Sequence, residues 1–245
     1  MTRRALLLAA ALPKRPWIMP AESAPHKRTW MAFGAHQNIW GAKLLPEVER
    51  NLIAIAQAVP KFEAVSILIP AVSAPSTNPQ IEFVVTPLDD LWIRDTGPVF
   101  VRGEQGQRSV IDLNFDVWGD KQAHNRDATV ATIVARKAAL RRMETGLILE
   151  GGGIEVDGAG TAIITESSVL NRNPDVPRAE IDREIGTLLG LDKKWKMARL
   201  GNLRAVLVSS ESLGAEAVEF AAGGVKRPLL FLRVAMIEEW PVILY

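Results

Sequence analysis

The strongest constraint on the fold is the order in which short apolar runs and helix-like segments follow one another. Runs of strand length, rich in β-branched residues, recur throughout the chain. Three longer segments with helical spacing lie between them, at residues 44–59, 127–141 and 175–190. The predicted strands lie at residues 27–33, 64–70, 81–86, 98–103, 109–115, 147–150, 153–157 and 161–165. Two or three strands for each helix predict an α/β or α+β fold rather than a helical bundle or a β-sandwich.

The helical segments carry recognisable start and stop signals. In residues 44–59, apolar side chains recur at helical spacing, and Pro46 falls where a first turn tolerates proline. In residues 175–190, Pro177 lies near the predicted first turn and Gly190 at the predicted end. The Asp157-Gly158 pair between two predicted strands indicates a hairpin turn.

Composition excludes several classes of protein. With 245 residues, 48% of them hydrophobic and 23% charged, the chain can bury a substantial core. A formal net charge of +1 gives no electrostatic case for a nucleic-acid partner or a membrane surface. The sequence contains no cysteine, which excludes disulfides, cysteine metal sites and a thiolate nucleophile within these residues. The three histidines show no paired ligand spacing, so no histidine metal centre is expected.

The N-terminus has features of an export signal. Arg3 and Arg4 precede an apolar stretch at residues 5–12, as in a twin-arginine or Sec signal. The stretch is short and no small-x-small cleavage site follows it. We therefore expect residues 1–15 to be a packed or frayed segment of a cytoplasmic protein, with export as the alternative.

Four stretches hold more polar and glycine residues than packing requires. They span residues 19–31, 88–100, 113–119 and 149–161, the last continued by 165–174. The second includes "LWIRDTGPVF", an apolar, strand-like run in which Arg94 and Asp95 precede a Gly-Pro turn. The carboxylates of Asp95 and Glu150 would suit a guanidinium, whose fork of N–H donors matches carboxylate oxygens.

Aromatic and glycine residues complete that hypothesis. Trp92 and Trp118 would stack on a cation, and the glycines at 151–153 would let a ligand approach the backbone. Structural interpretations stand beside it: an Arg94–Asp95 ion pair, tryptophans of the core, and a glycine bulge. The residues alone leave both open.

Taken in order, "MPAE…PHKRTWMAF", "DDLWIRDTGPVFV", "FDVWG", "LEGGGIEVDGAGT" and "LNRNP" resemble the agmatine deiminase and bacterial-type peptidylarginine deiminase family of the amidinotransferase-like superfamily. The resemblance implies a five-bladed α/β propeller (pentein), of which this chain would form about three to four blades. It also implies hydrolysis of the agmatine guanidinium to N-carbamoylputrescine and ammonia, a step of putrescine biosynthesis. In that chemistry a cysteine attacks the guanidinium carbon and a histidine moves protons, without a metal or organic cofactor.

The resemblance also implies roles for four residues of this chain. Asp95 matches the guanidinium-binding aspartate, and Glu150 matches an acid at the channel that either contacts the substrate or shapes the site; both are the candidate catalytic acids. Trp92 matches the tryptophan that lines the pocket, and Arg94 matches a structural position. The residues themselves add Trp118 for substrate binding and Gly151 and Gly152 as structural residues near the site. The expected partner is a small guanidinium compound, agmatine, with peptidyl-arginine as the alternative substrate; homo-oligomerisation stays open.

The match ends before the family's last motifs. The family's Gly-His-x-Asp motif and its C-terminal cysteine have no counterpart here. We divide the chain into residues 1–15, a partial propeller at 16–195, and a divergent tail at 196–245. The tail is interpreted as a frameshifted or recombined end, or as a genuine closing segment with strands near 204–210 and 227–234 and a helix at 210–220. We therefore expect weak or no deiminase activity, with a non-catalytic guanidinium-binding or interaction module, or a degraded remnant, as alternatives.

Overall fold

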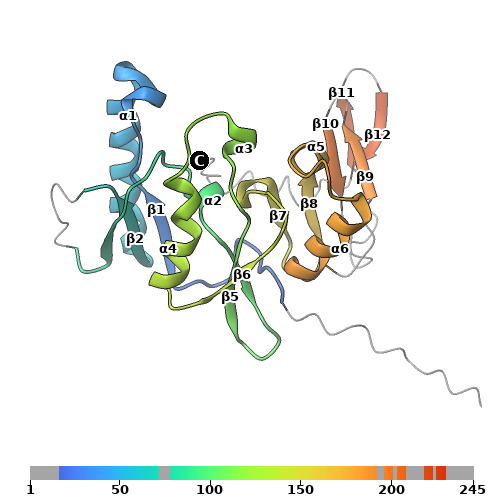
Figure 1. The fold of residues 1–245 in the computed structure, drawn as a ribbon, viewed down its shortest axis with the longest axis horizontal. Coiled ribbons are helices and arrows are strands. Elements are labelled where there is room, and N and C mark those ends of the chain that lie inside the picture. The colour runs from blue at the N-terminus through green and yellow to red at the C-terminus, as the bar shows by residue number, and fades with distance from the viewer. Residues whose placement is uncertain are drawn as a thin grey trace, which may run out of the picture.

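A computed structural model describes residues 17–71 and 78–191 of the protein (Figure 1). Of the remainder it describes the backbone of four strands, β9 (Lys196–Leu200), β10 (Leu203–Leu207), β11 (Val218–Ala222) and β12 (Val225–Leu229). The predicted signal-like segment at residues 1–15 lies outside the described residues. The described elements form a mixed α/β structure with several small sheets, as the order of strands and helices predicted.

The first sheet is parallel throughout, in the order β1-β2-β3. Its strands confirm the predictions for residues 27–33, 64–70 and 81–86: β1 (Arg28–Ala32), β2 (Ala64–Ile69) and β3 (Ile81–Val85). The connection from β1 to β2 contains α1 (Gln37–Ala58) and the short 3-10 helix η1 (Val59–Lys61). The backbone of α1 breaks at Gly41, so that Pro46 lies early in the helical segment that follows.

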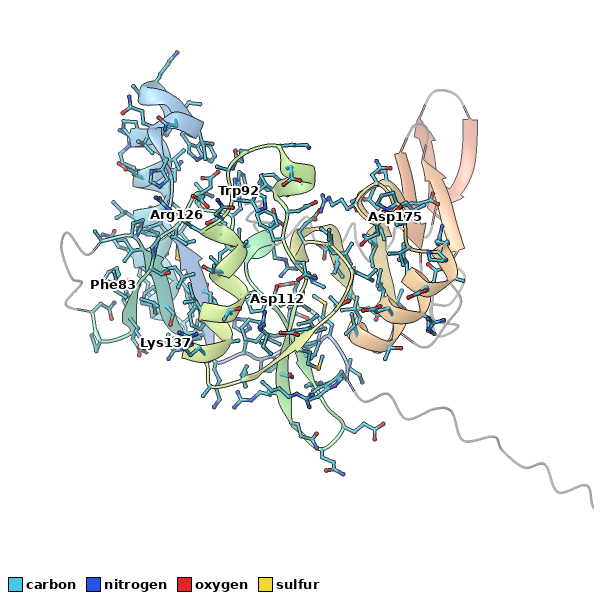
Figure 2. All side chains as sticks on the ribbon, in the orientation of Figure 1. Phe83, Trp92, Asp112, Arg126, Lys137 and Asp175 are labelled. Carbon is cyan, nitrogen blue, oxygen red and sulfur yellow. The ribbon has the colours of Figure 1, made fainter. Side chains whose placement is uncertain are left out.

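Helices cover both faces of this sheet, which explains the unbroken apolar sequence of β2. Val65 and Ile67 of β2 pack with α1, while Leu68 packs with α4 (Val130–Lys137). The 3-10 turn η2 (Asp127–Thr129) leads into α4. At the other end of α4, the Lys137 Nζ lies 2.6 Å from a carboxylate oxygen of Glu82 on β3 (Figure 2).

The second sheet has the order β4-β5-β6, with one antiparallel and one parallel pair. It contains β4 (Val99–Arg102), β5 (Arg108–Asp112) and β6 (Arg141–Glu144). The sequence predicted β4 and β5 but extended the helix at 127–141 into β6. The polar sequence "RRME" carries no strand signal of its own; it is placed by pairing with β5 and by Arg142, which donates to Asp112 at 2.6 Å (Figure 2).

The predicted strand at residues 147–150 is wrong. In place of a strand ladder, the partners of this segment are side-chain amides and one backbone group, the Leu113 carbonyl, which accepts from the Leu149 N–H at 2.8 Å. Asn173 accepts from the Ile148 N–H at 2.9 Å and donates to the Ile148 carbonyl at 3.0 Å. Asn114 donates to the Leu147 carbonyl at 2.9 Å. An isolated apolar run cannot reveal such long-range pairing.

The third sheet has the order β7-β8-β10-β9. The strands β7 (Ile154–Val156) and β8 (Ala162–Thr165) form the predicted hairpin, in which Gly158 has a φ of +70°. The short helix α5 (Glu166–Leu170) and α6 (Arg178–Leu189) follow. Ile181, Ile185 and Leu189 of α6 enter the large apolar core that also receives β4, β5, β7 and β8. Gly190 ends α6, as predicted, and its backbone has the left-handed conformation.

The tail adds strands to this arrangement. The strand β10 overlaps the predicted strand near 204–210 and pairs antiparallel with β8, and β12 overlaps the one near 227–234. The predicted helix at 210–220 is wrong at its end, because residues 218–220 belong to β11, which pairs with β12. Its other residues lie outside the described part. Within the described residues, no helix is both long and apolar enough to cross a membrane.

Candidate functional site

The stretch "LWIRDTGPVF" is not a continuous strand. Residues 93–96 form one helical turn, α2 (Ile93–Thr96), and β4 begins only at Val99. The Gly97 N–H donates to the Ile93 carbonyl at 2.9 Å, which closes the turn before Pro98. Because a helical turn does not alternate its side chains as a strand does, Asp95 can face the loop that contains Gly152.

Asp95 meets the triple-glycine turn η3 (Gly151–Gly153) directly. The Gly152 N–H donates to Asp95 Oδ1 at 3.0 Å. A Cβ atom on Gly152 would lie 2.0 Å from the same oxygen, and one on Gly151 would lie 2.6 Å from the Arg94 carbonyl oxygen. The glycines therefore allow α2 and η3 to approach each other, and this approach fixes the Asp95 carboxylate.

The electrostatics of Asp95 favour a cationic partner. Burial raises the pKa of its carboxyl group above the ordinary value. Hydrogen bonds from the Gly152 N–H and the Trp118 side chain, and the positive charges of Arg94 and Arg172, oppose that rise. An ionised carboxylate offers about four lone-pair directions. The two hydrogen bonds leave acceptor capacity on Asp95 for a further donor.

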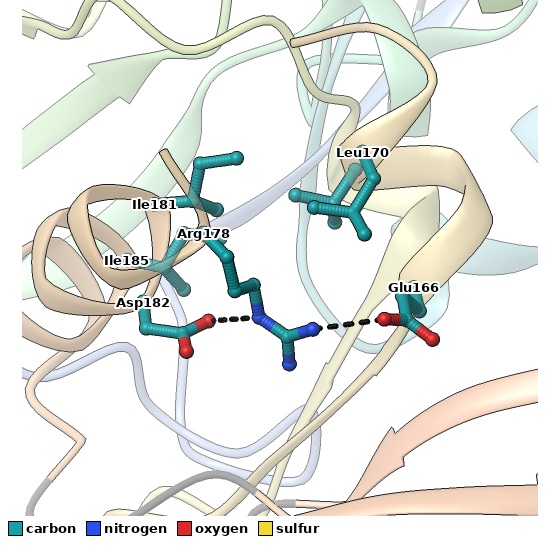
Figure 3. Close-up of a pocket in the computed structure, with 7 residues that line it drawn as sticks. Glu166, Leu170, Arg178, Ile181, Asp182 and Ile185 are labelled. Carbon is teal, nitrogen blue, oxygen red and sulfur yellow. Dashed lines mark hydrogen bonds and ion pairs between the residues drawn. The ribbon is translucent and has the colours of Figure 1, made fainter. Parts of the chain in front are cut away.

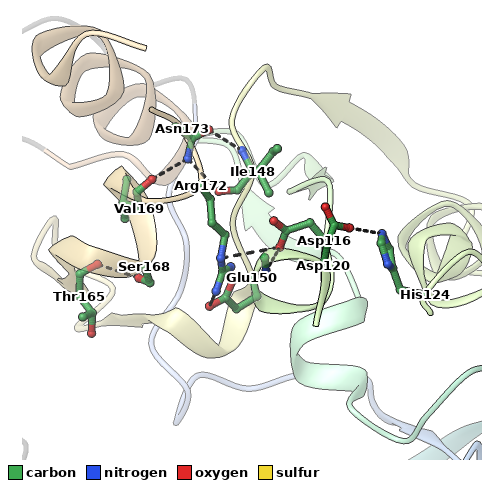
Figure 4. A network of polar contacts seen from close by, with 11 residues as sticks. Asp116, Asp120, His124, Ile148, Glu150, Thr165, Ser168, Val169, Arg172 and Asn173 are labelled. Carbon is green, nitrogen blue, oxygen red and sulfur yellow. Dashed lines mark hydrogen bonds and ion pairs between the residues drawn. The ribbon is translucent and has the colours of Figure 1, made fainter. Parts of the chain in front are cut away.

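Glu150, in contrast, is held by a guanidinium of the protein itself. Its side chain is buried, with 6% of the residue exposed. Arg172, in the turn after α5, donates from Nη2 to Glu150 Oε1 at 2.9 Å, and its Nη1 forms an ion pair with the other oxygen (Figure 4). The Nε of Arg172 lies 3.7 Å from Asp116 Oδ1. Arg172 thus joins two carboxylates, and burial lowers its pKa.

The "FDVWG" stretch forms a left-handed turn, α3 (Val117–Asp120). Val117, Trp118, Gly119 and Asp120 all have positive φ angles. L-residues pay about 1–2 kcal/mol each for this conformation, so the turn must be held from outside. Asp116 holds it at the start, where its side chain accepts from the Gly119 N–H at 3.1 Å. The turn brings Trp118 to Asp95.

Four aromatic rings lie around this turn. The rings of Trp40 and Trp92 stack with centroids 5.9 Å apart, Trp92 meets Trp118 edge-on at 6.0 Å, and Phe115 meets Trp118 edge-on at 5.4 Å. These distances are typical of favourable aromatic contacts. We call Trp40, Trp92 and Trp118 the tryptophan wall.

Arg94 points to a different set of carboxylates. It forms an ion pair with Glu22 in the segment before β1. The same arginine acts on Glu155 of β7, lowering a carboxyl pKa that burial raises more strongly. Arg94 therefore connects the 19–31 stretch to α2 and β7, close to Asp95 but with its own partners.

Two described cavities lie away from these residues. A small one of about 10 Å³ lies between α5 and α6. There Arg178 donates to Glu166 and to Asp182, both at 2.8 Å (Figure 3). An open groove of about 580 Å³ lies between β6 and the end of α6. Neither is lined by the predicted site residues, and in the described part no three His, Asp or Glu side chains gather as metal ligands would.

The predicted residues are thus brought together, with additions that the sequence reasoning missed. Asp95, Gly152 and Trp118 form one hydrogen-bonded group, Trp92 touches Trp118, and Glu150 immediately precedes the glycine turn. The missed residues are Trp40, Asp90, Asp116 and Arg172. Arg172 and Asp116 lay within the motifs already recognised, "LNRNP" and "FDVWG", whereas nothing in the sequence pattern marked Trp40.

The sequence matches a known family over residues 18–199, described as Porphyromonas-type peptidyl-arginine deiminase. The chain belongs to this family. Among curated relatives, it is 36% identical to an agmatine deiminase of Stutzerimonas stutzeri, over 72% of this chain and 51% of the relative. It is 35% identical to an agmatine deiminase of Pseudomonas fluorescens, over 71% and 51%.

A solved structure of a deiminase shares the fold. The agmatine deiminase of Enterococcus faecalis superposes with a TM-score of 0.66 at 25% identity, over 73% of this chain and 52% of that chain. The predicted pentein α/β-propeller fold is therefore confirmed. The chain spans about half the length of these deiminases.

Proposed function

We propose that these residues form the guanidinium-recognition part of an agmatine-deiminase-type protein. The observation that carries the proposal is the environment of Asp95, whose carboxylate is oriented by the Gly152 N–H at 3.0 Å and by the Trp118 side chain. A carboxylate fixed in this way can accept two N–H groups of a planar guanidinium. Trp92 and Trp118 supply aromatic faces for the cation.

In this proposal the two acidic positions have different roles. Asp95 binds the guanidinium of the substrate. Glu150 already shares a guanidinium with Asp116, that of Arg172. Glu150 would therefore act on the substrate only by transferring a proton or after Arg172 had moved away. In the described arrangement it shapes the site. Arg94, Gly151 and Gly152 hold the loops that carry Asp95.

The same electrostatics predict proton-linked binding. Burial raises the Asp95 pKa because it disfavours the charged form of the carboxyl group. A bound guanidinium favours the ionised form. Binding should therefore weaken as pH falls through the Asp95 pKa, and it should be accompanied by proton release.

Turnover needs groups that this sequence does not contain. Deiminase chemistry of this family uses a cysteine nucleophile and a proton-transferring histidine, and these 245 residues include no cysteine. Removing a nucleophile or its base from a catalytic unit costs on the order of 10⁴–10⁶ in rate. We therefore propose that the chain binds a guanidinium compound and releases ammonia slowly or not at all.

Isothermal titration calorimetry with agmatine tests the recognition step. The wild-type chain should bind, Asp95→Asn should weaken binding by at least about tenfold because a charge-assisted pair is lost, and Asp157→Asn, in the β7–β8 turn, should bind as the wild type does. An ammonia assay on the same samples tests turnover. Release of ammonia and N-carbamoylputrescine at an ordinary enzymatic rate would refute the inactivity.

Two alternative hypotheses make distinct predictions in the same titration. The matched family is described as a peptidyl-arginine deiminase, so peptidyl-arginine is the alternative substrate. An acetylated, amidated arginine peptide therefore serves as the second ligand. Tighter binding of the peptide than of agmatine would assign the site to peptidyl-arginine. A well-folded wild-type chain that binds neither ligand would refute recognition and favour an interaction module or a remnant.

A further inference from the structure

Asp90 is a buried carboxylate close to the tryptophan wall. Only 1% of the residue is exposed. One oxygen accepts from the Trp40 indole at 2.8 Å and from the Leu91 N–H at 2.9 Å. The other oxygen accepts from the Trp92 indole at 2.8 Å. Two tryptophans from different elements, α1 and the start of α2, therefore donate to a single side chain.

Two further carboxylates, those of Asp89 and Asp127, fix the backbone that carries Asp90. Asp127, at the start of η2, accepts from the Asp89 N–H at 2.8 Å and from the Asp90 N–H at 3.1 Å. In return, Asp89 accepts from the Arg126 and Asp127 N–H groups at 2.8 and 3.2 Å. These reciprocal bonds join the 88–91 loop to the helix that follows Asp127. Asp90 is thus attached to a rigid part of the fold.

The charge of Asp90 is balanced in an unusual way. Within the described residues, no lysine or arginine forms an ion pair with it, and its acceptors are met by two indoles and a backbone amide. Burying a carboxylate is costly unless hydrogen bonds compensate. An indole that donates to a carboxylate becomes richer in electron density, because hydrogen-bonded groups polarise one another. Its ring face then attracts a cation more strongly.

The contacts continue from Asp90 to Asp95. Trp92 is fixed by Asp90 and lies edge-on to Trp118 at 6.0 Å. The Trp118 side chain also acts on the Asp95 carboxyl group, whose pKa it lowers. Trp40 stacks on Trp92 and donates to the same carboxylate. An altered Trp92 ring would therefore change the position of Trp118 and, through it, the carboxylate at the proposed binding site.

We propose that Asp90 is a positioning residue for the guanidinium site, acting through Trp40 and Trp92, and that Trp40 is the third member of the cation-binding wall. This inference rests on the proposed function for its ligand, agmatine. It assigns to Asp90 no contact with the ligand. It predicts a specific coupling: a change at Asp90 reaches the Trp118 side chain through Trp92.

Nuclear magnetic resonance of the indole N–H groups measures this coupling. The full chain has seven tryptophans, and their signals are assigned with Trp40→Phe, Trp92→Phe and Trp118→Phe variants. In Asp90→Asn, the Trp40 and Trp92 signals should shift as a carboxylate acceptor is lost, and the Trp118 signal should shift with them. Asp112→Asn is the matched control: it removes another buried carboxylate, paired with Arg142, and should leave the Trp118 signal in place.

Agmatine titrations on the same variants measure the consequence. Asp90→Asn should weaken binding by about tenfold, the size expected when a hydrogen bond to a charged group is lost. Trp40→Phe should weaken it less, because phenylalanine keeps the stacking and loses the donor. If Asp90→Asn does not fold, Trp40→Phe alone decides: it should shift the Trp92 and Trp118 signals and weaken agmatine binding.

The outcomes separate this inference from the proposed function. A wild-type chain that does not bind agmatine refutes the proposed function, and the Trp118 signal then decides the positioning role by itself. If Trp40 and Trp92 shift in Asp90→Asn while Trp118 stays in place, the positioning role is refuted. Unchanged agmatine affinity in a folded Asp90→Asn variant, with a binding wild type, also refutes it.

Discussion

Asp127 gives the most quantitative prediction, because its pKa is displaced within the accessible pH range. Burial, together with the negative charges of Asp89 and Asp90, raises the pKa of the Asp127 carboxyl from 3.8 to about 6, against the effect of the two N–H groups that donate to it. Only 2% of the residue is exposed, so solvent screens the effect little. The perturbation proposed is Asp127→Asn, which keeps the shape and removes the titration.

The sign follows from the two pKa values. Between about pH 4 and pH 6 the folded state holds the Asp127 proton while the unfolded chain has released it, so the Asp127 contribution to stability falls as pH rises. At about 1.4 kcal/mol for each pH unit between the two pKa values, ionisation costs the folded state about 3 kcal/mol above pH 7. Most of this cost, about 2–3 kcal/mol, develops between pH 4 and pH 7.

Urea unfolding at several pH values measures this contribution. The free energy of unfolding of Asp127→Asn minus that of the wild type should increase by about 2–3 kcal/mol from pH 4 to pH 7. The loss of one acceptor for the Asp89 or Asp90 N–H adds an offset that does not depend on pH. Gln105→Ala, which removes no ionisable group, is the control and should give a flat difference. A flat difference for Asp127→Asn as well would refute the reasoning.

Three further changes test the packing around the site. Gly152→Ala places a Cβ atom 2.0 Å from the Asp95 carboxylate and should abolish agmatine binding in calorimetry while the chain still unfolds cooperatively. Gly190→Ala, at φ +72° and with its Cβ 2.1 Å from the Trp17 carbonyl oxygen, should lower the free energy of unfolding by about 1–3 kcal/mol. Gly186→Ala is its control: the added Cβ meets nothing nearer than 3.9 Å, so this variant should unfold close to the wild-type midpoint. Glu150→Met should lower the free energy of unfolding by about 3–5 kcal/mol, because it leaves the Arg172 charge buried without its main partner. In urea unfolding, the double variant with Arg172→Met should lose less stability than Glu150→Met alone. An equal or larger loss in the double variant would argue against a buried pair.

The parts of the fold that sequence predicts well are those with a local signal. The strands β1, β2 and β3 are apolar runs bounded by turn residues, and α6 has both its start and its glycine stop within one segment. The parts that it misses depend on distant partners. The polar strand β6 exists because β5 pairs with it, and residues 147–150 stay irregular because Asn173 and Asn114 bind their backbone.

The residues of the site also divide into those with a local sequence signal and those that depend on distant partners. Asp95, Trp92 and the glycines stand in dense motifs, so sequence finds them as candidates. Sequence cannot tell which carboxylate is already occupied, since the partner of Glu150 lies 22 positions along the chain. It also reads "LWIRD" as an extended run, whereas the helical turn α2 is what brings Asp95 to Gly152.

Arg172 carries the chemical group that the proposed ligand also carries. A guanidinium of the chain itself already contacts both oxygens of Glu150, so an outside guanidinium could pair with Glu150 in the same way only by replacing that side chain. Shortening the side chain, as in Arg172→Ala, would create a vacancy shaped for free guanidinium. Millimolar guanidinium, far below denaturing concentrations, should then raise the melting temperature of that variant by more than it raises that of the wild type. Arg172 thereby determines which of the two acidic side chains, Asp95 or Glu150, is available to an outside guanidinium. Adding guanidinium to the Arg172→Ala variant measures this effect directly.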